Sequence, residues 1–308
     1  MTAYAASGPN SLLARPRLPR DVPPAPPPRV RRGWLRRVRR NPMASVGAGI
    51  VLLLIFLALA APWITPAPYD RASFGDAWQF PSAQHWFGTD ALGRDLYTRI
   101  VYGARVSLTV GFVAQAIALA VGLPLGLAAG VLGGRVDFLV MRAVDTLTAF
   151  PQLLFALLVM VVLGAGLGNI LLAISFHAWI PICRLTRAQC LREREREYVE
   201  AARAQGAGEA AVVTRHVLPN ILAPIIVAVT LGIPQAIFTE AALSFLGLGV
   251  RAPTPSWGQM VGEGVANIRY YWHLALFPSV MIALTMAGFT LLGDGVRDVL
   301  DPRALKSS

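Results

Sequence analysis

The chain has 308 residues, of which 55% are hydrophobic and 15% are charged, and its mean hydropathy is +0.54. A soluble domain of ordinary composition carries more charge than this, so the chain is expected to be an integral membrane protein. The net charge of +11 does not indicate nucleic-acid binding. The arginines gather near the N-terminus and beside apolar runs, where the positive-inside rule accounts for them.

The chain contains two cysteines and four histidines. Cys183 and Cys190 are seven residues apart, and on one helix their Cα atoms would be about 10 Å apart, too far for a disulfide. We therefore expect free thiols. The histidines are scattered and form no ligand cluster with the cysteines, so neither a structural zinc site nor a bound cofactor is expected.

Residues 1–40 are rich in proline and arginine and predict a disordered cytoplasmic tail. The basic end of this tail, residues 29–40, lies next to the first apolar run and can contact anionic lipid headgroups. A cleavable signal peptide is the competing interpretation. The basic region is too long for one, and no small-residue cleavage site follows a short apolar core.

Six apolar segments are long enough to cross a bilayer, which takes about 20 helical residues. They fall at residues 46–64, between 105 and 135, twice within 146–183, at 221–238 and at 274–293. A glycine-rich turn at residues 164–169 divides the third segment from the fourth. The fourth is the least regular, because His177 and Pro181 interrupt it. The prediction is an all-α protein with six transmembrane helices and both termini in the cytoplasm.

Residues 65–105 have nearly balanced charge, as an exported loop tolerates. The expected organisation is a first transmembrane helix with its extracytoplasmic loop over residues 41–103, the main transmembrane domain over 104–297, and a cytoplasmic C-terminal tail over 298–308. Within the second span small residues recur every four positions, which predicts close packing against another helix. These residues are Gly122, Gly126 and Gly130.

A polar segment at residues 196–220 separates two apolar runs and reads REYVEAARAQGAGEAAVVTRHVLPN. Its first part favours a short helix that Gly206 and Gly208 stop, and a second short helix can follow before Pro219. Ala202 lies four residues before Gly206, so a second backbone could approach that face closely. This arrangement is typical of a docking element, and the alternative is an amphipathic linker on the membrane surface.

The segment resembles the EAA loop of inner-membrane permease subunits of ABC importers. One position departs from the usual pattern, because His216 stands where an isoleucine is common. An RHxLPN ending is similar to that of the peptide-transporter branch. The resemblance implies a coupling helix that sits in a cleft of an ATPase subunit. Its residues here are Glu200, Ala201, Ala202, Arg203, Gly206, Leu218 and Pro219.

Residues 85–111, HWFGTDALGRDLYTRIVYGARVSLTVG, resemble the extracytoplasmic signature of dipeptide and oligopeptide permease C-subunits. The first residues of the motif predict a turn whose side-chain oxygen caps the following backbone, and its second glycine predicts close packing. Arg94 and Arg99 are expected to be ion-pair partners of the two aspartates. The signature residues are Gly88, Thr89, Asp90, Gly93, Arg94 and Asp95.

Further stretches, at residues 137–154, 240–264 and 291–303, also resemble this family. Glu240 is the one acid close to a membrane span. Because acids inside a membrane are costly and face the protein interior, Glu240 is a candidate for lining the passage. The alternative is a structural role in an ion pair or in hydrogen bonds to loop amides.

The resemblance implies a type I ABC importer fold in a bacterial inner membrane. It also implies a second, non-identical permease subunit, two cytoplasmic ATPase subunits and an extracytoplasmic solute-binding protein. The sequence has no phosphate-binding loop, so the chain is not expected to be an enzyme. Short peptides are the favoured solute and nickel is the alternative. A secondary transporter or a membrane-embedded enzyme is less favoured, because the spans lack an ion site or a polar cluster.

Overall fold

The computed structural model of the protein describes residues 41–300, so the predicted N-terminal tail and residues 301–308 lie outside the described part. The described chain is helical apart from loops and one isolated β-bridge between Thr89 and Asp95. The elements are α2 (Pro42–Ile64), η1 (Phe74–Asp76), α3 (Leu96–Leu132), α4 (Gly134–Thr148), α5 (Gln152–Leu163), α6 (Leu167–Arg194), α7 (Glu197–Ala204), α8 (Glu209–Val212), η2 (Val213–Val217), α9 (Leu218–Phe245), α10 (Trp257–Val265) and α11 (His273–Leu300).

Within residues 41–300, five continuous helical segments are long and apolar enough to cross a membrane. They are α2, α3, α6, the run from Glu209 to Phe245, and α11. The pair α4 and α5 makes a sixth crossing if it is counted as one span, although it is bent by 77° at its break. The predicted six-span, all-α architecture is therefore confirmed as five continuous spans and one broken one.

The irregular span is the third and not the fourth, which corrects the sequence-based expectation. The third span breaks before Pro151, because proline disfavours a helical conformation in the residue that precedes it. The fourth span, α6, runs for 28 residues through Pro181. Neighbouring helices cover it on several sides, which is how membrane helices tolerate an internal proline. His177 lies beside the break, with Nε2 3.3 Å from the carbonyl oxygen of Leu147.

Two span boundaries also differ from the prediction. The second span begins at Leu96 and not near residue 105, because the Asp95 side chain caps the first turn of α3. The fifth span continues to Phe245, seven residues beyond the predicted end. The turn between the third and fourth spans is where it was predicted, and Gly164 and Gly166 in it both have positive φ angles.

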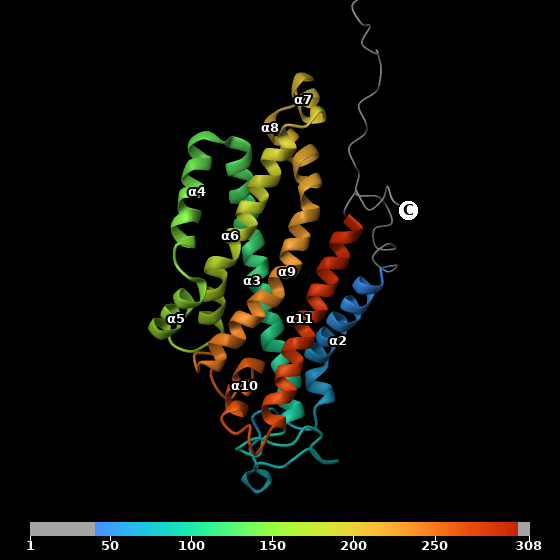
Figure 1. The fold of residues 1–308 in the computed structure, drawn as a ribbon, viewed down its shortest axis with the longest axis vertical. Helices are drawn as coiled ribbons and strands as arrows, with labels where there is room; N and C mark the ends of the chain where they lie inside the picture. The colour runs from blue at the N-terminus through green and yellow to red at the C-terminus, as the bar shows by residue number, and fades with distance from the viewer. Residues whose placement is uncertain (1–40, 301–308) are drawn as a thin grey trace, which may run out of the picture.

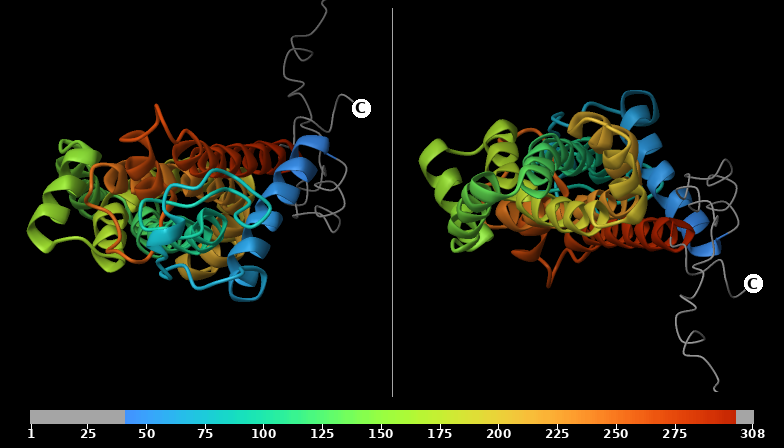
Figure 2. Two further views of the ribbon diagram at one scale, coloured as in Figure 1. Left: turned by 90° about the horizontal axis from the view of Figure 1, so that it is seen from below. Right: turned by 90° about the horizontal axis from the view of Figure 1, so that it is seen from above.

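Figure 1 shows how the helices are arranged. Helices α3, α6 and α9 form the centre of the bundle, with α4 and α5 at one edge and α2 at the other, and Figure 2 shows the same order from both ends. Helices α7 and α8 project from one end, and α10 and the loop before α3 cover the opposite end. Asn41 Nδ2 lies 3.5 Å from Asp298 Oδ2, so the two ends of the described chain lie together, as an even number of crossings requires.

The tightest helix contact joins α3 and α6 through the predicted glycine stripe. A Cβ on Gly122 or on Gly126 would lie 2.6 Å from a backbone carbonyl oxygen of α6, at Trp179 and Cys183 respectively. A Cβ on Gly130 would lie 2.5 Å from the Cβ of Cys190. The two backbones can touch only because these side chains are absent. Both cysteines are free, as predicted, and both are buried in this contact.

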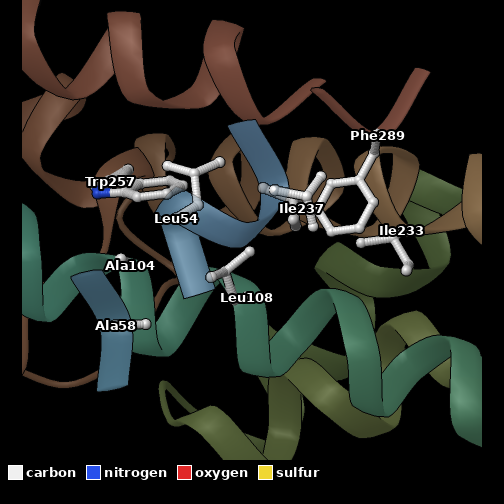
Figure 3. Packing of buried hydrophobic residues seen from close by; sticks show 9 residues of the cluster. Leu54, Ala58, Ala104, Leu108, Ile233, Ile237, Trp257 and Phe289 are labelled. Carbon is white, nitrogen blue, oxygen red and sulfur yellow. The ribbon is translucent and has the colours of Figure 1, made fainter. Parts of the chain in front are cut away.

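One apolar cluster joins the outer helices to the centre (Figure 3). Leu54 of α2, Leu108 of α3 and Ile237 of α9 pack together in it, beside Phe289 of α11. Trp257 of α10 is fully buried at its edge, and its indole Nε1 donates a hydrogen bond of 2.9 Å to the carbonyl oxygen of Ile100. The cluster therefore fixes α10 to the first turns of α3.

Candidate functional site

The segment predicted to dock another protein forms an elbow at one end of the bundle, made of α7, residues 205–208 and α8 (Figure 1). Gly206 has a φ of +86°, and the N–H of Ala207 donates to the carbonyl oxygen of Ala202 at 3.1 Å. This is the glycine cap that the sequence predicts, closing the last turn of α7. Gly208 has a φ of −66°, so only the first of the two glycines uses the left-handed conformation.

The second helix of the elbow begins at Glu209 as predicted, but it does not end before Pro219. It passes through the π-turn η2 directly into α9. Proline has no N–H to give to a helix and its ring crowds the preceding turn. The π-turn accommodates the proline because it is wider than an α-helical turn. In it the N–H of Leu218 donates to the carbonyl oxygen of Val213, five residues back. Leu218 and Pro219 therefore lie at the base of the elbow, where the fifth span begins.

The inner face of the elbow is anchored to the bundle. Val199 and Val212 are fully buried against residues of α3, α6 and α9. The hydroxyl of Tyr198 donates to Glu193 at the end of α6 and accepts a hydrogen bond of 2.9 Å from Asn220 in α9. Burial and the bond to Glu193 raise the pKa of Tyr198 well above its ordinary value, so the hydroxyl keeps its proton at any physiological pH.

The outer face of the elbow is exposed. Glu200, Arg203 and Gly206 are open to solvent, while Ala201 and Ala202 are half-buried. Arg203 forms a bidentate pair with Glu209, with N–O distances of 2.9 and 3.1 Å. This pair bridges α7 and α8 across Gly206, and the sequence analysis did not identify it. The result is a short projection with charged groups at its tip.

The extracytoplasmic signature forms a buried charged cluster at the opposite end of the bundle. Asp90 Oδ1 accepts the backbone N–H groups of Leu92 and Arg94 at 2.9 and 3.0 Å, which confirms the predicted capped turn. Asp90 Oδ2 accepts from Arg94 Nε at 2.6 Å and from Arg99 Nη1. Glu263 of α10 completes the cluster, with Oε2 3.0 Å from Arg99 Nη1.

Arg99 does not pair with Asp95, which corrects the expected pairing of two aspartates with two arginines. Asp95 instead accepts the backbone N–H and the hydroxyl of Thr98, both at 2.8 Å, and so caps α3. Its other oxygen lies 3.0 Å from Nδ1 of His85. Asp95 is used as a helix cap because α3 begins at the next residue, nine positions earlier than the sequence suggested.

The remaining signature residues shape the loop before α3. Gly93 has a φ of +70°, and a Cβ there would overlap the carbonyl oxygen of Ser73, so the predicted close packing is confirmed. Gly88 also has a positive φ and packs against the ring of His273. The Thr89 hydroxyl accepts the backbone N–H of Gln79 at 2.8 Å.

Glu240 is fully buried in α9. Its carboxylate accepts hydrogen bonds from the hydroxyls of Ser244 at 2.7 Å and Ser107 of α3 at 3.2 Å. Ser256, just before α10, continues this chain of hydroxyls to Ser244 at 3.3 Å. In this conformation the carboxylate reaches no exposed surface of the chain, and its partners are hydroxyls and not the ion-pair partner or loop amides of the structural alternative.

The structure is thus a helical membrane bundle with an exposed elbow at one end and a folded polar loop region at the other. Residues 122–306 match the family described as binding-protein-dependent transport system inner membrane component. Residues 31–84 match the N-terminal transmembrane domain of oligopeptide transport permease C. The chain belongs to this family and is a permease subunit of an ABC importer.

Individual proteins agree with this assignment. The chain is 43% identical to the dipeptide transport system permease protein DppC of Bacillus subtilis (strain 168), over 87% of this chain and 84% of that protein. It is 44% identical to the oligopeptide permease OppC of the same organism, over 88% of each. It is 44% identical to the glutathione transport system permease protein GsiD of Shigella flexneri serotype 5b, over 92% and 94%.

The fold is also that of a solved transporter. An inward-facing structure of the MetNI methionine ABC transporter contains a chain that matches 66% of this one over 97% of its own length. The TM-score is 0.56 at 22% sequence identity. At this identity the likeness concerns the fold alone, and it confirms the expected type I importer architecture for the core of the bundle.

The charged cluster leads to a stability prediction. Replacing Asp90 with asparagine leaves two buried or nearly buried guanidinium groups with only Glu263 as a counter-charge, so we expect a loss of about 3–5 kcal/mol. Asp70 lies in the same loop and is exposed, so Asp70→Asn should change stability by less than about 0.5 kcal/mol. Thermal unfolding of the purified protein in detergent measures both, and equal stability of the two variants would contradict the structural role of Asp90.

Proposed function

We propose that the chain forms half of the passage in an ABC importer of short peptides. In this assembly it pairs with a second, non-identical permease subunit. The assembly contains two ATPase subunits, one of which docks at the elbow of this chain, and a solute-binding protein docks at the opposite end. The observation that carries the proposal is the elbow, which is anchored at its base by buried valines and is exposed and charged at its tip.

The connections of the elbow suit it to transmit force. On one side α7 follows α6 after two residues, and on the other side α8 continues through η2 into α9. A displacement of the elbow by a closing ATPase pair would therefore move two central spans together. Such movement shifts the population between inward-open and outward-open states, because the closed ATPase pair binds one state better than the other.

Charge supports placing the elbow in the cytoplasm. Arg135 and Arg142 belong to α4, and the arginines of residues 184–215 lie in the second half of α6 and in the segment between α6 and α9 that contains the elbow. Figure 1 shows α4 in the half of the bundle that carries the elbow. Basic residues beside membrane spans favour the cytoplasmic side. The protein is thus a multi-pass inner-membrane subunit whose described ends both face the cytoplasm, with α10 and the signature loop outside.

Reporter fusions test this orientation. Asn169 lies in the first turn of α6, and Gly206 lies in the elbow that follows the other end of this helix. A reporter fused at Asn169 should indicate export, and one fused at Gly206 should indicate the cytoplasm. If both fusions indicate the same side, α6 does not cross the membrane and the proposed topology is wrong.

A substitution at Gly206 tests the coupling role. A Cβ at this position would meet no atom within 4 Å, so Gly206→Leu costs only the strain of a positive φ, roughly 1 kcal/mol, and adds bulk on the outer face. We expect insertion to persist while substrate-stimulated ATPase activity falls by about tenfold, the effect of losing about 1.4 kcal/mol of docking free energy.

Gly247 provides a matched control for this experiment. It has a φ of +80° and equally open space around it, but it lies at the other end of the bundle, after α9. Gly247→Leu therefore imposes the same backbone strain without touching the elbow. Normal coupling in Gly206→Leu, or an equal loss in both variants, would reject the assignment of the elbow.

Peptides are favoured over nickel as the solute for two reasons. The similar permeases are named for dipeptide, oligopeptide and glutathione transport. Among residues 41–300, no group of three or more His, Cys, Asp and Glu side chains is placed to hold a metal ion. Within the spans, His177 packs against Phe155 and Cys183 is buried against α3. Neither offers a ligand to a passing nickel ion.

Uptake in a deletion strain tests the solute. We expect accumulation of labelled dipeptide and tetrapeptide to fall to the background level and to return when the gene is restored, while nickel accumulation stays at the parental level. The reverse pattern, in which nickel accumulation falls and peptide uptake persists, would show that the peptide assignment is wrong.

A further inference from the structure

A cleft of about 230 Å³ lies at the end of the bundle opposite the elbow, between the signature loop, the start of α3 and α10. Its apolar lining includes Trp78, Leu96 and Met260. Arg94 and Arg99 supply its positive charges. We call this the Arg99 cleft. It lies at the level of the loops, beyond the apolar belt of the helices, where a polar solute can reach it.

Arg99, which lines this cleft, has unused hydrogen-bonding capacity. Its side chain is 1% exposed, and its Nη1 atom contacts both Asp90 and Glu263. Its Nε and Nη2 atoms are buried and have no hydrogen-bond partner in the described part of the chain. These two nitrogens form one edge of the guanidinium plane, with two parallel N–H groups. That edge matches the two oxygens of a carboxylate.

The two carboxylates already in the cluster are held very differently. Asp90 is 5% exposed, and two backbone N–H groups and both arginines bind it. The side chain of Glu263 is 42% exposed. It lies 3.0 Å from Arg99 and 3.8 Å from Arg94, and Gln259 Nε2 donates to its other oxygen at 2.9 Å. Asp90 is therefore a fixed part of the cluster, whereas Glu263 can turn outward to solvent.

We propose that the Arg99 cleft binds the carboxylate of a small solute, which takes the place of Glu263 on Arg99 and Arg94. The exchange keeps the charge of the cleft constant, because one carboxylate replaces another. When Glu263 leaves, the Arg99 guanidinium turns its Nε and Nη2 edge toward the incoming group, which then gains two donors that Glu263 does not use. For a short peptide the group is its terminal carboxylate, and this identity of the solute rests on the proposed function.

The size and lining of the cleft restrict what can bind. At about 230 Å³ it is smaller than a pocket that encloses a drug-sized molecule, so it accepts only the carboxylate-bearing end of a peptide. Leu96, Met260 and Leu274 then contact the terminal side chain without selecting a particular one. Competition from Glu263 keeps the affinity low. A transport subunit that must release its solute requires such low affinity.

The test uses Glu263→Gln in the assembled transporter, reconstituted in lipid nanodiscs without nucleotide. Glutamine keeps the hydrogen bond with Gln259 but no longer competes as an anion. Saturation-transfer NMR with acetate, alanyl-alanine and alanyl-alanine amide measures binding. We expect acetate and alanyl-alanine to bind the Glu263→Gln variant about tenfold more tightly than they bind the unmodified protein. Alanyl-alanine amide has no carboxylate and should bind neither protein.

A matched control removes one carboxylate elsewhere. Asp145 of α4 pairs with Arg184 of α6 at 2.8 Å, and neither residue lines the Arg99 cleft, so Asp145→Asn changes the net charge by the same amount at another place. It should leave the affinity for acetate unchanged. Arg99→Lys, which lacks the two-pronged edge, should lose carboxylate binding if it folds, but the gain in Glu263→Gln carries the argument without it.

Three results would overturn the site. They are an affinity in Glu263→Gln equal to or below that of the unmodified protein, equal binding of the amide, and a change in docking of the solute-binding protein with no change in acetate affinity. The last result would assign the carboxylate to a protein side chain. Tight acetate binding without peptide uptake would reject the peptide solute and retain the carboxylate site. Peptide uptake without acetate binding would reject the carboxylate site and retain the peptide solute.

Discussion

The close contact between α3 and α6 is the constraint on which the rest of the structure depends. Three glycines of α3 face the backbone of α6, and any side chain at two of them would meet a carbonyl oxygen at 2.6 Å. Dispersion and packing are the main attractions between helices in lipid, so this approach replaces the hydrophobic effect as the source of stability. The contact also joins the two functional ends, because α3 begins in the charged cluster and α6 ends at the elbow.

Two ion pairs between α4 and α6 compensate for the limited apolar contact of the broken span. Asp137 pairs with Arg187, with one N–O distance of 2.6 Å, and Asp145 pairs with Arg184, and both pairs fasten α4 to α6. Because α4 and α5 are bent apart by 77°, α4 cannot rely on the long apolar contact that a straight span makes. The Asp137–Arg187 pair holds the first turn of α4 and the Asp145–Arg184 pair holds its last turn, and both pairs are partly exposed, which reduces the cost of desolvating them.

How much the sequence predicts depends on how local the cause is. The cap at Gly206, the glycine stripe of α3 and the capped turn at Asp90 each depend on a few neighbouring residues, and all three were predicted correctly. The pairing of Arg99 with Glu263 was missed, because 164 residues separate them and only the packing of α10 brings them together. The fusion of α8 with α9 was missed because Pro219 indicates a stop, and only the π-turn removes that obstacle.

The span boundaries also show the difference between features that have a local cause and features that depend on long-range contacts. The sequence predicts the second span after Arg105 because a long stretch without charge begins there, whereas the residues before it include the charged Arg99 and Arg105. In the structure those residues form the first turns of α3, and their polar groups are satisfied by contacts from outside the helix. Arg99 is covered by Asp90 and Glu263, and the Ile100 carbonyl oxygen accepts from Trp257. A polar turn can continue a membrane helix only where such tertiary partners exist, and no local pattern reveals them.

The contacts between α10 and the first turns of α3 also determine how the Arg99 cleft can work. If Glu263 were the only link between α10 and α3, its displacement would free α10 and the cleft would act as a gate. Trp257 is instead fully buried at the start of α10, and its indole is bonded to Ile100 of α3. The backbone of α10 therefore stays in place when the Glu263 side chain turns away. A carboxylate can enter and leave the cleft through the motion of side chains alone, which suits a site that exchanges solute quickly.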